Sequence, residues 1–123
     1  MKIPKAILER RRCVRVSENF TFKIDCYDGQ DLDAETLNIS MHGVMCRVSA
    51  DIRLMTVVNI SLYLPAAGSD FRASKRIALR GVVVRKDKEA SAGQYLIAIY
   101  FSEIKPKDQK TLQQFIEARL KAT

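Results

Sequence analysis

An arginine-rich segment near the N-terminus carries side chains that can bind both phosphate and guanine. Four arginines stand within six residues in the segment 9–16, Glu-Arg-Arg-Arg-Cys-Val-Arg-Val. Arginine presents a planar fork of donors that binds phosphate in bidentate fashion, and it stacks on flat rings. It also reads the O6/N7 edge of guanine, a contact that discriminates by about 1–3 kcal/mol. Basic runs are also typical of solvated tails, so this segment alone does not predict a site.

A second polar segment, Asn38-Ile39-Ser40-Met41-His42-Gly43, separates two apolar stretches. Asn and Ser are frequent in turns because their side chains bond nearby backbone groups. Gly43 could supply a backbone angle that other residues resist. Taken alone, the segment predicts an ordinary turn between two strands. The same compact polar groups can bond a ligand where such a turn faces a cleft.

The sequence gives little support for an enzyme or a metal site, and we predict no catalytic residues. It contains no Gly-x-Gly-x-x-Gly, P-loop or Gly-x-Ser-x-Gly pattern. The single histidine, His42, leaves little room for a Ser-His-Asp site. Cys13, Cys26 and Cys46 match no metal-binding spacing, and we expect Cys26 and Cys46 to be buried, reduced thiols. We therefore expect no metal and no cofactor.

Length and charge favour one small domain with an anionic partner. The chain has 123 residues, of which 47% are hydrophobic, enough for one core. Its net charge of +7 favours nucleic acid, a phosphorylated ligand or an acidic protein surface. No apolar run approaches the ~20 residues that span a membrane, and residues 1–5 contain no signal-peptide pattern. We expect a cytoplasmic protein without membrane insertion.

Alternation of apolar and polar residues predicts six short strands. In the first strand Phe20, Phe22, Ile24 and Cys26 share one face, which we expect to point inward. The other strands are predicted over residues 32–39, 44–48, 58–64, 77–86 and 94–101. The sixth strand is apolar on both faces, so we expect a helix to cover it.

A helix is predicted to begin at Pro106, with Leu112, Phe115, Ile116 and Leu120 on one stripe. Six strands and one helix predict a closed or nearly closed antiparallel barrel with a packed helix. We assign residues 1–18 to an arginine-rich arm, flexible or with a short helix over residues 4–12. Residues 19–123 form the barrel domain in this interpretation.

Together, the two polar segments resemble the PilZ domain family. The family has an R-x-x-x-R motif before the first strand, which residues 11–15 fill, from Arg11 to Arg15. Its second motif, [D/N]-x-S-x-x-G, lies between the second and third strands and is filled by residues 38–43. The resemblance covers residues 9–118 and includes the last two strands and the helix. Ala98 departs from the family, which often has glycine there.

The resemblance implies a mainly β fold, a six-stranded antiparallel PilZ-like split barrel with a C-terminal helix, in a bacterial receptor for cyclic di-GMP. It also implies which residues bind the ligand. The predicted binding residues are Arg10, Arg11, Arg12, Arg15, Asn38, Ser40 and Gly43. His42 and Arg47 are secondary candidates, and their alternatives are a surface turn histidine and a solvated strand arginine.

We expect the receptor to change conformation when cyclic di-GMP orders the arm, and to signal to an effector protein that the sequence does not identify. We expect a monomer or a weak homodimer. One alternative is a PilZ-fold interaction module that binds no nucleotide. Another is a small basic barrel that binds single-stranded nucleic acid. We do not expect nucleic acid, because the chain lacks tryptophan and Phe20 and Phe22 are predicted to point inward.

Overall fold

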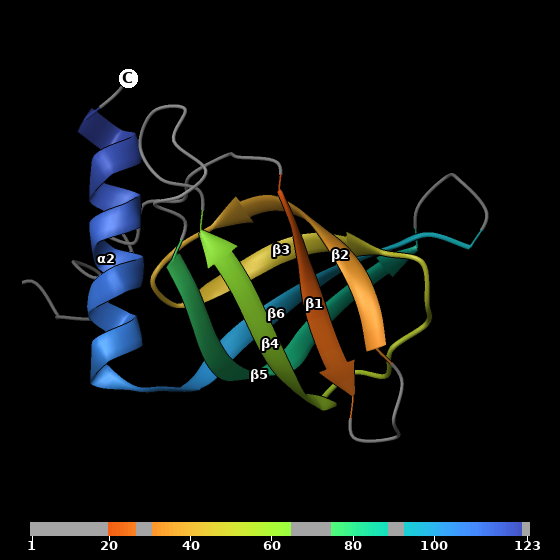
Figure 1. Ribbon diagram of the computed structural model, residues 1–123. Helices are drawn as coiled ribbons and strands as arrows, with labels where there is room; N and C mark the ends of the chain where they lie inside the picture. The colour runs from red at the N-terminus through yellow and green to blue at the C-terminus, as the bar shows by residue number, and fades with distance from the viewer. Residues whose placement is uncertain (1–19, 27–30, 65–74, 89–92, 122–123) are drawn as a thin grey trace, which may run out of the picture.

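The computed structural model describes residues 20–26, 31–64, 75–88 and 93–121 of the chain. These residues form a closed barrel of six antiparallel strands, ordered β1-β2-β3-β6-β5-β4, with one helix, α2, beside it (Figure 1). The strands are β1 (Thr21–Cys26), β2 (Asp31–Ile39), β3 (Gly43–Val48), β4 (Val57–Leu64), β5 (Lys75–Lys88) and β6 (Tyr95–Ile104), and the helix α2 is Pro106–Lys121. The predicted fold class is confirmed.

Strict alternation along the strands fills the barrel interior, as the sequence predicts. In β1 every second residue is buried, from Phe22 to Cys26, while the residues between them are exposed. β3 and β4 follow the same rule, because successive side chains of a strand point to opposite faces. Cys26 and Cys46 are buried free thiols, as expected. Cys13 lies outside the described residues.

The helix does not cover β6, so that part of the prediction is wrong. α2 packs against β5 at one end of the barrel (Figure 1). On the outer side of β6, Tyr100 remains 52% exposed. Apolar residues on both faces of a strand indicate that its outer face avoids charge, but they do not identify what lies over it.

The apolar stripe of α2 is shorter than predicted. Leu112, Phe115 and Ile116 are buried, whereas Leu120 is 42% exposed. The Phe115 ring packs edge-on against Phe20, with ring centroids 6.1 Å apart. This contact ties the helix to the residue at which the described chain enters β1.

Several strand ends differ from the predicted ones. β5 begins before residue 77 and continues past residue 86, through Asp87 and Lys88. β6 continues to Ile104 rather than ending at Phe101. The expected short helix over residues 4–12 lies outside the described residues. No helix among the described residues is both long and apolar enough to cross a bilayer.

Candidate functional site

The described chain enters the barrel beside the second motif. The backbone N–H of Thr36 in β2 donates a 2.8 Å hydrogen bond to the carbonyl oxygen of Phe20. Phe20 immediately precedes β1, and Thr36 lies two residues before Asn38. The predicted arm residues Arg10, Arg11, Arg12 and Arg15 lie outside the described residues. The hydrogen bond nevertheless fixes the point from which the preceding segment must start.

A β-bulge determines where Asn38 points. Thr36 pairs with Cys46 and Asn38 pairs with Met45, so Leu37 is an extra residue without a partner across the ladder. By simple alternation Asn38 would share the buried face of Ala34 and Thr36. The bulge shifts the alternation, so that Ile39 is buried and Asn38 lies on the outer side.

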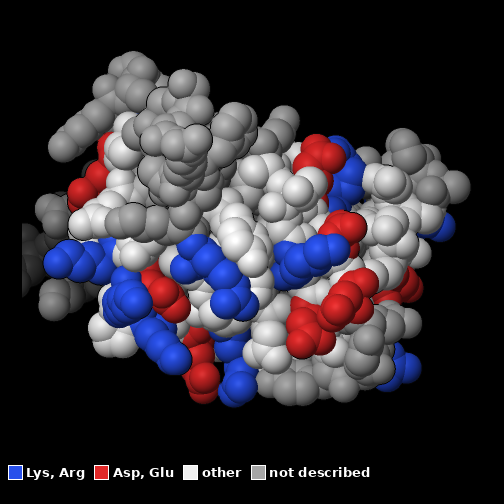
Figure 2. All heavy atoms as spheres, in the orientation of Figure 1, with Lys and Arg blue, Asp and Glu red and all other residues white. Residues whose placement is uncertain are grey.

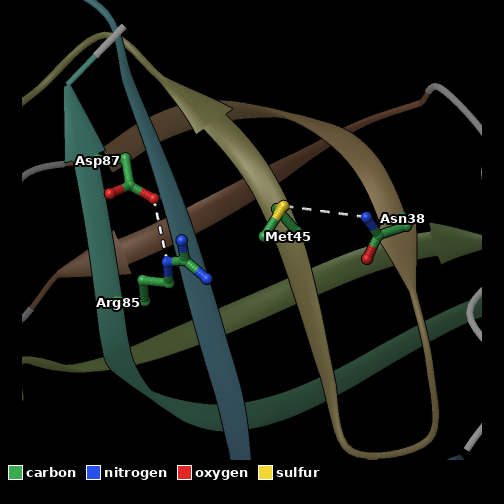
Figure 3. A network of polar contacts seen from close by, with 4 residues as sticks. All are labelled: Asn38, Met45, Arg85 and Asp87. Carbon is green, nitrogen blue, oxygen red and sulfur yellow. Dashed lines mark hydrogen bonds and ion pairs between the residues drawn. The ribbon is translucent and has the colours of Figure 1, made fainter.

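On that side the amide nitrogen of Asn38 lies 3.9 Å from the sulfur of Met45 (Figure 3). The amide is half-buried and lies over the strand pair β2–β3. The bulge therefore presents the Asn side chain of the second motif to the surface of the barrel instead of its core.

The turn after Asn38 is shorter than predicted and is stabilised by the hydroxyl of Ser40. Asn38 and Ile39 still belong to β2, and only residues 40–42 lie between the strands. Ser40 Oγ accepts a 3.2 Å hydrogen bond from His42 N–H and lies 3.4 Å from the carbonyl oxygen of Gly43, to which it can donate. Ser40 N–H donates to the same carbonyl at 2.9 Å. Ser40 is only 3% exposed, and the hydrogen bonds of its hydroxyl lie within the turn.

Gly43 is required here by close packing. Among the described residues only Gly93, of the glycines, has a positive φ, so the expected unusual backbone angle at Gly43 is wrong. A Cβ on Gly43 would lie 2.4 Å from the carbonyl oxygen of Ile99 in β6. The neighbouring carbonyl of His42 accepts a 2.8 Å hydrogen bond from Phe101 N–H. The glycine therefore lets the turn lie directly against β6, and the His42 side chain is exposed beside it.

An apolar outer surface adjoins this turn, and we call it the turn face. It comprises Met45 of β3, Ala98 and Tyr100 of β6, and Val84 of β5, which are next to one another in the barrel order. Val84 and Tyr100 are 51% and 52% exposed. A small pocket of about 150 Å³ lies where this surface meets the turn, and Ser40, His42, Gly43 and Ala98 are among the residues that line it. Exposed apolar side chains beside a compact polar turn suit a planar ligand with polar edges.

Two arginines flank the turn face. Arg47, half-buried on β3, is paired with Glu35 at 3.2 Å. Arg85 Nε is 3.0 Å from Asp87 Oδ2 on β5 (Figure 3). Arg85 was not among the residues predicted from the sequence, and simple alternation from the buried Val83 would place it inside. A second bulge, between Val83 and Arg85, turns it outward opposite Ala98.

The chemistry available at the turn face is that of apolar contacts, hydrogen bonds and charge pairs. No group of three His, Cys, Asp or Glu side chains among them could hold a metal ion. Burial raises the pKa of the Cys46 thiol to about 12, so this cysteine stays protonated and unreactive near neutral pH. The turn face is an apolar surface with the Asn38 amide at one edge. A guanidinium group flanks it on each side, Arg47 on β3 and Arg85 on β5. This arrangement can hold a flat ring and pair with anionic groups at its edges.

Comparison with known proteins agrees with the fold. The PilZ domain model matches residues 9–118. No curated protein matches the sequence. Among solved structures, the Bacillus subtilis inhibitor of motility, MotI/DgrA, superimposes with a TM-score of 0.70 at 21% identity and covers 88% of this chain. This chain spans 50% of that protein's length.

Two further structures were solved with c-di-GMP. The PilZ domain of YcgR from Escherichia coli has a TM-score of 0.66 at 17% identity, with 92% of this chain and 97% of that chain covered. The PlzA protein of Borreliella burgdorferi has a TM-score of 0.58 at 10% identity, with 97% of this chain and 56% of that chain covered. At these identities the likeness shows a shared fold.

Proposed function

The chain belongs to the PilZ domain family, and from this premise we propose that it is a cytoplasmic receptor for cyclic di-GMP that signals to a partner protein. The family consists of receptor and adaptor modules, which agrees with the lack of support for an enzyme in the sequence. We propose that the ligand binds on the turn face, beneath the arginine-rich arm.

The observation that carries this proposal is the hydrogen bond between Thr36 N–H and the carbonyl of Phe20. Arg15 precedes Phe20 by five residues, and an extended chain of that length reaches at most about 17 Å. The Asn38 side chain and the turn after it lie only a few residues along β2 from this junction. The two motifs can therefore act on one ligand, which neither could bind specifically alone.

The proposed roles follow from the chemistry of each group. Arg11 and Arg15 contact guanine edges and phosphates, and Arg10 and Arg12 add phosphate contacts or stack on a base. The Asn38 amide offers both a donor and an acceptor from the barrel side.

The remaining motif residues act mainly through the backbone. Ser40 and Gly43 hold the turn close to β6, since the hydroxyl of Ser40 is engaged within the turn and Gly43 has no room for a Cβ. Tyr100 provides an exposed ring on which a guanine can stack, and Arg85 supplies a cation at the far side of the face. His42 and Arg47 stand at the borders of this surface as secondary contacts.

We expect moderate affinity. Ordering the arm costs about 1–2 kcal/mol for each backbone residue that becomes fixed, which offsets part of the stacking and charge pairing. The expected dissociation constant is in the micromolar range, which corresponds to a binding free energy of about −8 kcal/mol.

Isothermal titration calorimetry with cyclic di-GMP tests the proposal, with GTP and cyclic di-AMP as competing ligands. An Arg15→Ala variant should weaken cyclic di-GMP binding by up to about a hundredfold, because it removes a guanine-reading contact worth about 1–3 kcal/mol. Arg53→Ala is the matched control, since Arg53 is exposed on the loop between β3 and β4. Equal affinity of the two variants, or equal binding of all three nucleotides, would refute the proposal.

Amide hydrogen exchange tests the proposed switch separately. If cyclic di-GMP draws the arm onto the turn face, amides of residues 5–16 should exchange more slowly in the complex. The newly formed surface is then available to a partner protein. Unchanged exchange at saturating ligand would exclude the switch while leaving nucleotide binding intact.

A further inference from the structure

A second surface feature lies further along the same pair of strands, where β5 extends past the end of β6. The last β5–β6 pair is Leu79 with Ile104, whereas β4 pairs with β5 down to Lys75. A groove of about 810 Å³ lies along this step. Its lining includes Asn59 and Ser61 of β4, Arg76, Ala78 and Arg80 of β5, and Glu103 and Lys105 at the end of β6. We call this feature the basic groove.

Cations predominate in the basic groove. Arg76, Arg80 and Lys105 line it with one carboxylate, that of Glu103, and a second carboxylate, Asp108 of α2, accepts a 3.4 Å hydrogen bond from Ala78 N–H beside it. In Figure 2, Lys and Arg lie over the start of β5 and the adjoining end of α2 with a few Asp and Glu among them, while several Asp and Glu lie over β1 and β2. On the face shown, cations are therefore more frequent beside the groove than over β1 and β2.

The charged side chains of the groove are exposed to solvent, even where they form an ion pair. Arg80 Nη1 lies 3.4 Å from Glu103 Oε2, and their side chains are 44% and 69% exposed. Arg76 Nη2 donates to Ser61 Oγ at 3.4 Å, a contact that leaves its other donors for a ligand. An exposed pair such as Arg80–Glu103 contributes little and can be exchanged for another carboxylate at small cost.

The spacing of the two arginines fits an extended peptide. Arg76, Ala78 and Arg80 alternate outward on one strand, so the arginine Cα atoms stand about 13 Å apart. Carboxylates at positions i and i+4 of an extended segment have the same separation. Ala78 between them is small, so it leaves room for the side chain at i+2.

We infer that the basic groove is a docking site for an acidic, extended segment of a partner protein, with carboxylates paired to Arg76, Arg80 and Lys105. A single-stranded nucleic acid is the less favoured ligand. None of the described residues that line the groove is aromatic, so bases would find no ring to stack on. The site is separate from the turn face and does not depend on nucleotide binding.

Fluorescence anisotropy with a labelled peptide tests this inference. The probe is fluorescein-Gly-Glu-Thr-Glu-Thr-Glu-Gly-amide, whose first and third glutamates, four residues apart, match the arginine spacing. A double variant, Arg76→Ser with Arg80→Ser, should weaken binding about tenfold, since it removes two exposed charge pairs. Arg53→Ser is the control for loss of a cation elsewhere, and two-state melting of each variant verifies that it remains folded.

Removing a negative charge from the groove gives the sharper test. Glu103→Gln removes the carboxylate that competes for Arg80, so it should strengthen peptide binding by roughly threefold. The matched control is Glu35→Gln, because Glu35 is likewise paired with an arginine but lies on β2. If both variants change affinity equally, the attraction is only that of net charge and the inference fails.

Three other outcomes would also overturn it. Equal peptide affinity in the double variant and in Arg53→Ser would mean that the groove is not the site. A single-stranded oligo-dT that binds more tightly than the peptide, and loses affinity in the double variant, would assign the groove to nucleic acid. Absence of peptide binding at low salt, where charge attraction is strongest, would leave the groove without an acidic partner.

Discussion

The turn face and the basic groove lie on the same barrel, yet they are built in different ways. The turn face depends on irregular backbone: bulges in β2 and β5 turn Asn38 and Arg85 outward, and Gly43 allows a close approach to β6. On β5 the basic groove follows regular alternation, which places Arg76 and Arg80 on one side, although β6 has a bulge at Ser102 in the groove wall. Small backbone changes should therefore damage the turn face, whereas charge and salt should govern the groove.

Burial separates the two regions further. Ser40 at the turn is 3% exposed, and its hydroxyl is engaged with the turn backbone. In the groove, Ser61 contacts an exposed arginine, and the Arg80–Glu103 pair is open to solvent. A region with its polar groups already satisfied presents one shape to a ligand, while an open charged region can adapt to different partners.

Gly43→Ala should have the largest effect among single substitutions that compare the regions. The new Cβ would lie 2.4 Å from a backbone oxygen of Ile99, so β3 and β6 must separate. We expect the free energy of unfolding to fall by about 2–3 kcal/mol in urea denaturation. Ala78→Val, on the exposed floor of the groove, should change stability by less than about 0.5 kcal/mol. Similar losses in both variants would show that the turn is no tighter than the groove.

A rise in pH should destabilise the protein through Cys46, which lies on β3 beneath the turn face. Burial raises its pKa in the folded state from the ordinary 9.0 to about 12. Above pH 9 the unfolded thiol ionises while the folded one stays protonated, so stability is constant below this range and falls within it. The difference between wild type and Cys46→Ala should shrink by about 1.4 kcal/mol between pH 7 and pH 10.

Peptide binding in the basic groove should respond to salt instead, because its charged groups are exposed to solvent. Stability curves of wild type and Cys46→Ala that stay parallel up to pH 10 would contradict the assigned cause.

The smallest predicted effect compares two serines. Ser40→Ala removes the acceptor for His42 N–H within a buried turn, and we expect a loss of about 1 kcal/mol. Ser61→Ala removes only an exposed contact to Arg76 and should cost less than about 0.5 kcal/mol. Thermal unfolding of the two variants measures the difference, and a costlier Ser61 substitution would reverse the comparison.

The sequence predicted the interior of the barrel well, because burial there follows a period of two. Val44, Cys46 and Val48 point inward for that reason alone. The orientations of Asn38 and Arg85 could not be derived in the same way, since a bulge depends on how two strands pair and leaves no fixed residue pattern. For Asn38, the resemblance to the PilZ motif predicted a ligand-facing side chain, which the periodicity of the strand could not predict.

Two errors have a common cause. The sequence predicted that the helix would cover β6, and it did not reveal the basic groove. Both depend on which strands lie side by side and where each strand ends. β5 extends past the end of β6, and α2 packs against β5 and not over β6. From the sequence, Arg76 and Arg80 are ordinary solvent-facing strand residues. The groove follows only from the strand pairing, in which Leu79 and Ile104 are the last pair between β5 and β6.

Backbone-amide NMR during titration with cyclic di-GMP tests the central claim most directly, because it identifies ligand binding and its location together. We predict that chemical shifts change for residues 38–45 and 98–100, around the turn face, while those of Arg76, Arg80 and Lys105 stay in place. Shifts concentrated at the basic groove, or none at saturating nucleotide, would contradict the account.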